Sequence, residues 1–326
     1  MLGRLDLWQQ EHRIAAFPIA VFRKFSDDRA GRLAALIAYY GFFSVFPAML
    51  ALVTILGFVL ENHPAERTSI AHSALAQFPI IGDSIASSVS HPLTGNVLAL
   101  VIGLGGAAWA ALGAMQAAQD AMNEVWDVRR SEYPGFIAKR VRSLLMMLLL
   151  IVLIVTTTTV SQLAAVVVSG VAATGGLAIA SVIVSSGAFL IAFRVLTVKQ
   201  VTWREVAPGA VTAGVFYTAL QIAGGAYVTR TLNGAQSTYG TFATVIGLLS
   251  WLFLIAQVTL LAAEVNVVAT KAMWPRSLFT APATAADKRS ATAQADKETI
   301  DATENVDVDF SGDVRGSDDG DRHART

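Results

Sequence analysis

The residues best suited to chemistry in this sequence are polar side chains inside apolar stretches. Ser250, Gln257 and Glu264 recur every seven residues, which on an ideal helix places them within about 20° of one another. A carboxyl group inside an apolar segment is costly unless it faces a partner, a water-filled cavity or the interior of a bundle. We therefore predict that Glu264 either forms a structural salt bridge or has a functional role, in which it carries a proton or binds a cation. The candidate salt-bridge partners are Arg140, Arg194 and Arg204.

A second polar group occurs near the end of an earlier apolar segment. Gln116, Asp120 and Asn123 follow i, i+4, i+7 spacing, so on a helix they share one face. The stretch "AYYGFFSVFPAML", residues 38–50, adds two tyrosines at its entrance. We predict a polar, cytoplasm-facing substrate cavity built from Tyr39, Tyr40, Ser44, Asp120, Asn123, Gln257 and Glu264. The alternative is an interfacial belt in which tyrosine and Trp126 only anchor the helices.

The elements that position these residues are apolar enough to cross a membrane. The chain of 326 residues is 54% hydrophobic and 15% charged, with a mean hydropathy of +0.54, which is too apolar for an ordinary soluble domain. Apolar segments lie at about 33–60, 95–115, 143–169, 174–193, 206–228 and 239–269. We predict an all-α, polytopic membrane protein with six transmembrane helices. The third and fourth form either a tight external hairpin or a broken pair that does not fully cross.

The distribution of lysine and arginine predicts the orientation. Basic residues concentrate before the first segment, between the second and third, after the fourth and after the sixth, and such loops face the cytoplasm. We therefore predict a cytoplasmic N-terminal segment at 1–32, a six-helix transmembrane domain at 33–272 and a cytoplasmic tail at 273–326, with both termini inside. From Ser277 onward the tail carries eleven acidic and six basic residues, which predicts disorder. The positive body is expected to lie against anionic lipid headgroups.

Pro47 stands inside the first apolar segment. In water it would argue against a helix, because it removes a backbone hydrogen bond. In a bilayer a helix is still the economical form. We predict that Pro47 kinks the first helix and acts as a hinge, the alternative being a packing kink without function.

Other classes of site find little support in the sequence. There is no cysteine, which excludes disulfides, thiolate catalysis and cysteine metal sites. His63, His72 and His91 share one external loop without ligand-like spacing, so we predict no metal and no cofactor. That external segment, about 64–92, is expected to lie on the membrane surface, or alternatively to act as a lid.

Four blocks of sequence resemble a known family. They are "LAALIAYYGFFSVFPAMLALV", "WAALGAMQAAQDAMNEVWDV", "TWREVAPGAV" and "TYGTFATVIGLLSWLFLIAQVTLLAAEVNVV". In order and spacing they resemble the YihY/virulence factor BrkB family of bacterial inner-membrane proteins, over about residues 20–272. Phe253 and Ala262 depart from the family pattern, where a tyrosine and a glycine are expected. The resemblance implies a multi-pass protein of the bacterial inner membrane. The family's old label, ribonuclease BN, is not supported, because no aqueous domain holds a catalytic cluster.

These observations predict a transporter or lipid translocase rather than an enzyme. The expected partners are membrane lipids and a lipid or small-molecule substrate, with no nucleic acid. A non-transporting scaffold for envelope assembly is the competing class. A lipid-modifying enzyme that pairs Asp120 with Glu264 is a third.

Overall fold

The computed structural model describes residues 2–59, 97–147, 172–227, 241–277, 283–299, 306 and 308. Within these ranges the regular structure is entirely helical, so the prediction of an all-α protein is confirmed. The helices are α1 (Leu2–Glu11), α2 (Arg13–Asp27), α3 (Ala30–Val59), α6 (Val97–Val125), the 3₁₀ turn η1 (Arg130–Glu132), α8 (Ala172–Leu196), α9 (Trp203–Tyr227), α11 (Thr241–Thr270) and α12 (Ala285–Lys297). Residues 136–147 are also helical.

Several helices coincide with the predicted apolar segments. Three of the described stretches are long and apolar enough to cross a membrane, namely Ala178–Leu196, Trp203–Gly224 and Val245–Thr270, and Ala30–Val45 is a shorter apolar helix. The count of six spans and the cytoplasmic termini stay predictions. Pro47 lies within α3, which continues to Val59; a kink there also stays a prediction. The external segment 64–92 and its histidines lie outside the described residues.

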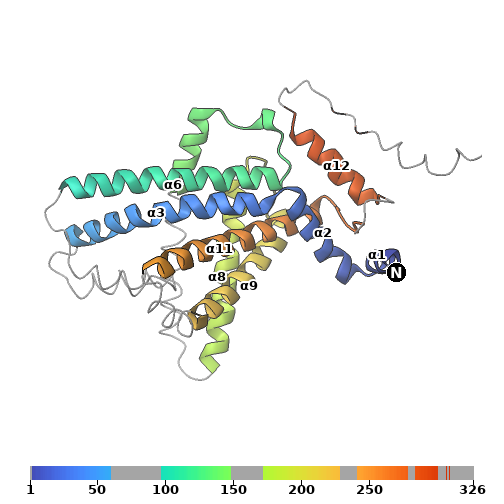
Figure 1. The fold of residues 1–326 in the computed structure, drawn as a ribbon, viewed down its shortest axis with the longest axis horizontal. Helices are drawn as coiled ribbons and strands as arrows, with labels where there is room; N and C mark the ends of the chain where they lie inside the picture. Colours follow the sequence, from blue (N-terminus) through green and yellow to red (C-terminus); the bar gives the residue numbers. More distant parts are fainter. Residues whose placement is uncertain are drawn as a thin grey trace, which may run out of the picture.

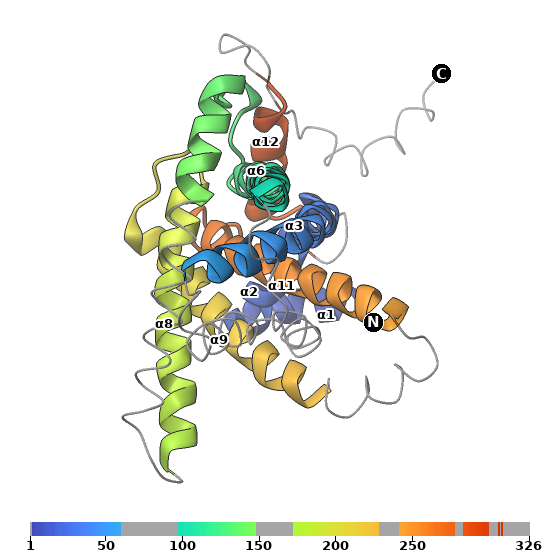
Figure 2. The ribbon, with the colours of Figure 1, turned by 90° about the vertical axis from the view of Figure 1, so that its left-hand side faces the viewer.

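The long helices form two packed pairs that α11 joins. α3 packs against α6, α8 packs against α9, and α11 contacts both α9 and α3. Figure 1 shows α6 along its length, whereas Figure 2 shows it nearly end-on beside α8, which is there seen along its length. The two pairs therefore cross at a steep angle. α11 contacts both pairs, and α6 also contacts α8 directly.

The contact between α9 and α11 depends on a glycine. The Gly209 N–H donates to Asn266 Oδ1 at 2.6 Å. A Cβ at Gly209 would lie 2.1 Å from the Ala262 carbonyl oxygen and 2.5 Å from Asn266 Nδ2. Only a residue without a side chain allows this approach.

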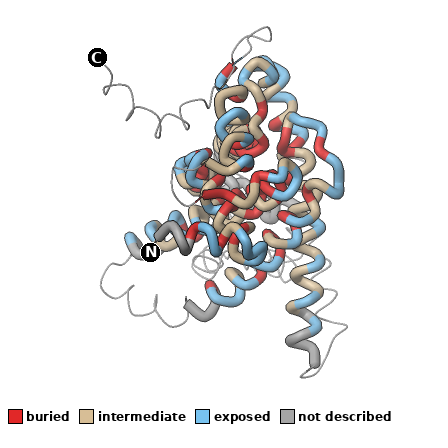
Figure 3. Tube along the Cα trace, turned by 90° about the vertical axis from the view of Figure 1, so that its right-hand side faces the viewer, coloured by how far each residue is buried: buried red, intermediate tan, exposed pale blue. Residues whose placement is uncertain are grey.

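Buried residues concentrate at one end of the molecule, where the last turns of α6 and α11 meet α2 and α12; this end faces the viewer in Figure 3. We call this region the capped end. Trp126, Met122, Phe193 and Leu260 are among its fully buried large side chains. α3 and the turns after α2, α6 and α11 also contribute to it. Each of these turns contains one left-handed residue, namely Arg29, Asp127 and Ala272 in that order, with φ of 52°, 50° and 50°.

The prediction of a disordered tail is wrong for residues 283–299. α12 begins with a capping box, in which the Thr284 side chain accepts from Asp287 N and the Asp287 side chain accepts from Thr284 N. Ala286, Ser290 and Lys297 are buried. Polar composition predicts disorder because such a segment buries little apolar surface. Here ion pairs with distant parts of the chain hold the helix in place.

Candidate functional site

The most unusual feature of the capped end is a buried group of charged side chains, which we call the charge cluster. Its members are Lys24, Lys271, Lys297, Asp28, Glu124, Asp127 and Glu264. They come from α2, the end of α6, the end of α11 and α12. Charges are rarely buried without partners, and most of these side chains have one.

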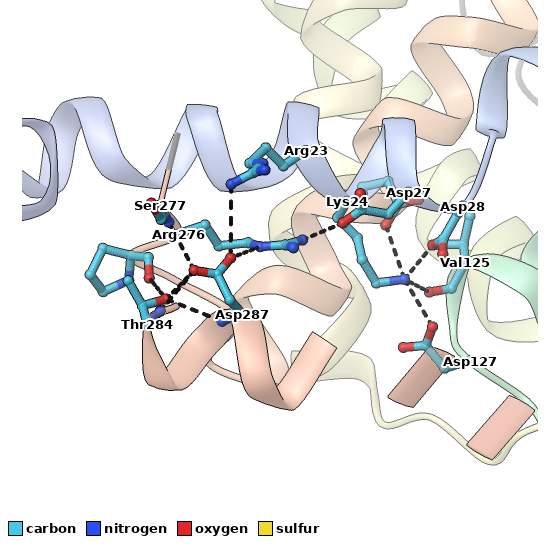
Figure 4. Close-up of polar contacts among 12 residues, drawn as sticks. Arg23, Lys24, Asp27, Asp28, Val125, Asp127, Arg276, Ser277, Thr284 and Asp287 are labelled. Atoms are coloured by element: carbon cyan, nitrogen blue, oxygen red, sulfur yellow. Dashed lines mark hydrogen bonds and ion pairs between the residues drawn. The ribbon is translucent and has the colours of Figure 1, made fainter. Parts of the chain in front are cut away.

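Lys24 lies at the centre of the cluster and is fully buried. Its Nζ donates to a carboxylate oxygen of Asp28, to Asp127 Oδ1 at 2.9 Å and to the Val125 carbonyl at 3.3 Å (Figure 4). Burial alone would lower the pKa of Lys24, but Glu264, Asp28 and Asp127 outweigh it and hold that pKa above its ordinary value. Lys24 is therefore held as a cation, and it joins α2 to the end of α6.

Asp127 is placed by the turn that ends α6. Its left-handed backbone and the bond from Val128 N to the Asn123 carbonyl at 2.9 Å close that helix, a typical C-terminal arrangement. Lys271 Nζ donates to Asp127 Oδ2 at 2.7 Å. Burial raises the pKa of Asp127, but Lys24 and Lys271 outweigh that effect and hold the pKa below its usual value.

Lys297 brings α12 into the cluster. Its Nζ donates to Asp28 Oδ1 at 2.8 Å and lies 2.9 Å from Glu124 Oε1. Burial lowers the pKa of Lys297, but these two carboxylates raise it above the ordinary value. The last residue of α12 is thus fixed to both α2 and α6.

Glu264 is the member with the poorest pairing. It is fully buried, and its nearest cation in the described chain is Lys24 Nζ at 4.0 Å. Neither of its oxygens accepts a hydrogen bond from a described residue. The predicted arginine partners are wrong, because the cation comes from the N-terminal helix α2, which the hydropathy pattern does not place beside α11. The cluster holds four carboxyl groups and three lysines, so one carboxyl group lacks a full partner.

A second ionic group fixes the start of α12 to the N-terminal helices. Arg276 donates from Nη1 to Asp27 Oδ2 at 2.6 Å and from Nε to Asp287 Oδ1 at 2.9 Å (Figure 4). Ser277 Oγ donates to Asp6 Oδ2 at 2.9 Å. The N-terminal helices and the start of α12 are therefore packed together at the capped end.

A polar pocket of about 260 Å³ lies beside the charge cluster. Its lining residues are Asp127, Val128, Arg129, Glu132, Lys199, Lys271, Ala293 and Asp296. Asp127 and Lys271 belong to both the pocket and the cluster. Arg129 lies 3.3 Å from Asp296, whereas Lys199 makes no ion pair or hydrogen bond within the described residues. The pocket thus offers a cation that is available to an anionic group.

The structure distributes the predicted site residues among several contacts. The rings of Tyr39 and Tyr40 contact each other edge to face with centroids 5.5 Å apart, and both side chains are exposed. Tyr40 also lies against Gly113, and Ser44 Oγ donates to the Gly41 carbonyl at 2.7 Å on the same helix. Gln257 is half-buried on α11.

The two polar residues on α6 have partners outside the predicted cavity group. Lys139 Nζ donates to both Asp120 oxygens, at 2.7 and 2.8 Å. Asn123 is buried and accepts from Val198 N at 3.0 Å. Asp120 is partly exposed and paired with Lys139, whereas Glu264 is buried near Lys24. The lipid-enzyme hypothesis required these two carboxyl groups to act together, and the contacts described here do not join them.

Sequence reasoning missed most of the charge cluster. Lys24 and Asp28 are spaced i, i+4 just before the first apolar segment, a spacing that favours an ion pair on a helix. This ion pair could therefore have been predicted from the sequence. No local spacing indicates the ion pairs of Lys297, because its partners Glu124 and Asp28 lie 173 and 269 residues away in sequence. In the described part of the chain no group of three or more potential metal ligands occurs.

Comparisons with known proteins agree with the resemblance seen in the sequence. The sequence model of a family described as Virulence factor BrkB matches residues 21–286. Two curated relatives are the UPF0761 membrane protein Smlt0865 of Stenotrophomonas maltophilia strain K279a and the UPF0761 membrane protein of strain R551-3. Each is 24% identical over 287 residues, covering 81% of this chain and 64% of the relative. The chain thus spans less than two thirds of their length. No solved structure matches.

Proposed function

Because this chain belongs to the virulence factor BrkB family of membrane proteins, we propose that it is a transporter or lipid translocase of the bacterial inner membrane. The proposal includes six spans, both termini in the cytoplasm and a hinge at Pro47. In this orientation the capped end faces the cytoplasm, and Tyr39, Tyr40 and Asp120 lie toward the same side.

The observation that carries the proposal is the contact between the pocket and the charge cluster. Asp127 and Lys271 line the pocket, and Asp127 accepts from Lys24. Lys24 in turn lies 4.0 Å from Glu264, inside the membrane-length stretch Val245–Thr270. A charged substrate in the pocket would compete for Lys271 and Asp127, and this competition would change the pairing of Lys24 with Glu264. Intramembrane carboxyl groups commonly mark substrate or proton pathways.

The pocket charges suggest the substrate class. Its basic residues are Arg129, Lys199 and Lys271, and its acidic residues are Asp127, Glu132 and Asp296. Lys199 lacks an ion-pair partner among the described residues. Lys271 donates to Asp127, and it supplies a second ammonium group when an anionic headgroup competes with that carboxylate. Ammonium groups bind phosphate well as point charges. We therefore propose a substrate with an anionic, phosphate-bearing headgroup.

A flux assay tests this function. The protein is reconstituted in vesicles of phosphatidylethanolamine and phosphatidylglycerol that carry a fluorescent phosphatidylglycerol, and transfer between leaflets is followed by chemical quenching. We expect flux with the wild type and a loss of about tenfold with Lys199→Gln, since one of two headgroup cations is removed. Arg140→Gln is the matched control, because Arg140 is exposed and contacts the Phe136 ring outside the pocket. Equal flux in wild-type and protein-free vesicles would contradict lipid translocation.

The scaffold is the second candidate, and the closed packing around Glu264 favours it. Glu264 and Lys24 are both fully buried, and the N-terminal helices and α12 form an ordered cap. A scaffold needs such a folded surface and no path for a substrate. Folded protein that transports neither lipid nor small phosphate-bearing solutes in the same vesicles would favour this class.

A further inference from the structure

The N-terminal helix α2 has an apolar face that no described element covers. From Ile14 to Phe22 the sequence IAAFPIAVF contains no charge, so the helix is apolar on every side over this stretch. Ile14 is 93% exposed and Phe22 is 60% exposed, and Pro18 lies on the same side and is exposed. A helix that is apolar all round belongs in a protein core or in lipid, and only one side of α2 lies in a core.

The other side of α2 packs on the last turns of α11. Ala20 and Val21 form a buried cluster with Val268, and Phe17, Leu261 and Val265 pack against that cluster. These α11 residues lie within the membrane-length stretch Val245–Thr270. α2 therefore lies at the depth at which α11 leaves the apolar layer, with its uncovered side turned away from the protein.

The short connection between α2 and α3 also keeps α2 close to the end of a long apolar helix. α2 ends at Asp27 and α3 begins at Ala30, so only two residues separate them. Figure 1 shows α2 leaving the end of α3 obliquely and α1 continuing beyond it. A nine-residue uncharged stretch is too short to cross a bilayer, which leaves a position along the surface.

The residues around the apolar face also suit a membrane surface. Trp8, on α1, is 53% exposed, and tryptophan is enriched at the interface between lipid and water. Arg13, Arg29 and Arg32 are exposed, against the exposed Glu11, and basic side chains bind anionic headgroups. Pro18 has no N–H, so the Ile14 carbonyl cannot accept the usual bond from residue 18. Water among the headgroups can satisfy that carbonyl, whereas the hydrocarbon core cannot.

We propose that α2 is an interfacial anchor whose Ile14–Pro18–Phe22 face lies in the headgroup region of an anionic bilayer. The contact between α2 and the bilayer fixes the depth of the capped end relative to the membrane surface. This proposal does not depend on whether the protein transports a substrate.

Spin labelling tests this directly, because the chain has no cysteine and single cysteines can be labelled cleanly. The variants Ile14→Cys and Phe22→Cys carry a nitroxide in vesicles of phosphatidylethanolamine and phosphatidylglycerol. Thr292→Cys, exposed on α12, is the aqueous control, and Ile183→Cys, 66% exposed on α8, is the lipid-facing reference. Accessibility to oxygen and to a water-soluble nickel chelate gives the depth of each label.

We expect nickel accessibility at positions 14 and 22 roughly threefold lower than at 292, with oxygen accessibility closer to that at 183. Nickel accessibility at 14 and 22 equal to that at 292 would overturn the proposal. Spin–spin broadening between labels would instead show that a second copy covers the face, and it would also overturn it. All four positions are exposed, so the labelled variants should unfold at the wild-type temperature, which is measured alongside.

Discussion

Lys24 Nζ lies 2.9 Å from Asp127 Oδ1, although 103 residues of sequence separate the two. The contact joins the N-terminal helix α2 to the turn that ends α6, and both side chains are almost fully buried. Asp127 also accepts from Lys271 after α11. Three segments that are distant in sequence therefore meet at one carboxylate.

Removing the ammonium group of Lys24, the central cation of the charge cluster, should lower the stability of the fold strongly. In Lys24→Met the carboxyl groups of Asp28, Asp127 and Glu264 stay buried without their shared cation. Breaking a buried ion pair from one side costs about 3–5 kcal/mol, so we expect the free energy of unfolding to fall by that amount. Reversible unfolding in mixed detergent micelles measures it. Lys199→Met, at an exposed position, is the control, and an equal loss in both variants would show that burial of Lys24 carries no special weight.

The loss of stability at acid pH should depend on Asp127. Burial raises its pKa, but Lys24 and Lys271 hold it below the ordinary 3.8. A carboxylate with a lowered pKa in the folded state adds stability that is full above the unfolded pKa and is lost as pH falls through the folded pKa. We therefore expect a falling unfolding temperature below about pH 4. Asp127→Asn should be less stable at neutral pH and should lose less on acidification; an acid limb as steep as the wild type's would contradict the assignment.

The alkaline limit follows from the lysines. Burial lowers the pKa values of Lys24 and Lys297, but neighbouring carboxylates hold both above the ordinary 10.5. A raised lysine pKa adds stability that is full below the unfolded pKa and is lost as pH rises through the folded pKa. The unfolding temperature should therefore show no loss from these lysines until the pH exceeds about 10.5. A decline that begins near pH 8 and disappears in Lys297→Ala would contradict this.

Lys297 should decide whether α12 stays docked. Its ammonium group bonds to Asp28 and pairs with Glu124, so Lys297→Ala leaves both carboxylates without that cation. We expect faster amide hydrogen exchange over Ala285–Lys297, with little change in α8 and α9. Thr292→Ala is the control, because among the described residues the Thr292 hydroxyl bonds within its own helix, to the Lys288 carbonyl at 3.0 Å. Unchanged exchange in Lys297→Ala would show that the Arg276–Asp287 contacts suffice.

A pair of glycine substitutions tests the packing of α9 on α11. Gly209→Ala places a Cβ 2.1 Å from the Ala262 carbonyl oxygen, and overpacking of this kind costs about 1–3 kcal/mol or more. Gly187→Ala meets no atom within 4 Å and should stabilise its helix by about 0.5–1 kcal/mol. Opposite shifts in unfolding temperature are expected. Equal shifts would contradict the close contact at Gly209.

The sequence predicted several of the described long helices, because hydropathy reports directly on long apolar segments. The predicted segment 239–269 and α11, Thr241–Thr270, nearly coincide. The family was also recognisable, because the four blocks kept their order. The placement of Glu264 in a costly, functionally interesting environment was predictable from its neighbours, but its partner was not. Partner choice depends on how α2 folds back, and no periodicity within α11 contains that information.

The C-terminal tail shows a second limit of prediction from sequence. Composition alone predicted disorder after residue 273, yet α12 is ordered by Lys297 and by Asp287, which pairs with Arg276. These contacts are single ion pairs between distant segments. A compositional argument averages over such contacts, so it could not find them.

Glu264→Gln tests the central claim, that the carboxyl group at position 264 serves transport rather than stability. Glutamine keeps the shape of the side chain, and Glu264 accepts no hydrogen bond from a described residue. Because the cluster holds one carboxyl group more than its lysines, we expect the free energy of unfolding to stay within about 1 kcal/mol of wild type. Flux in the vesicle assay should fall by about tenfold or more. Full flux in a stable Glu264→Gln protein would contradict the account, and so would a large loss of stability, which would make Glu264 a structural residue.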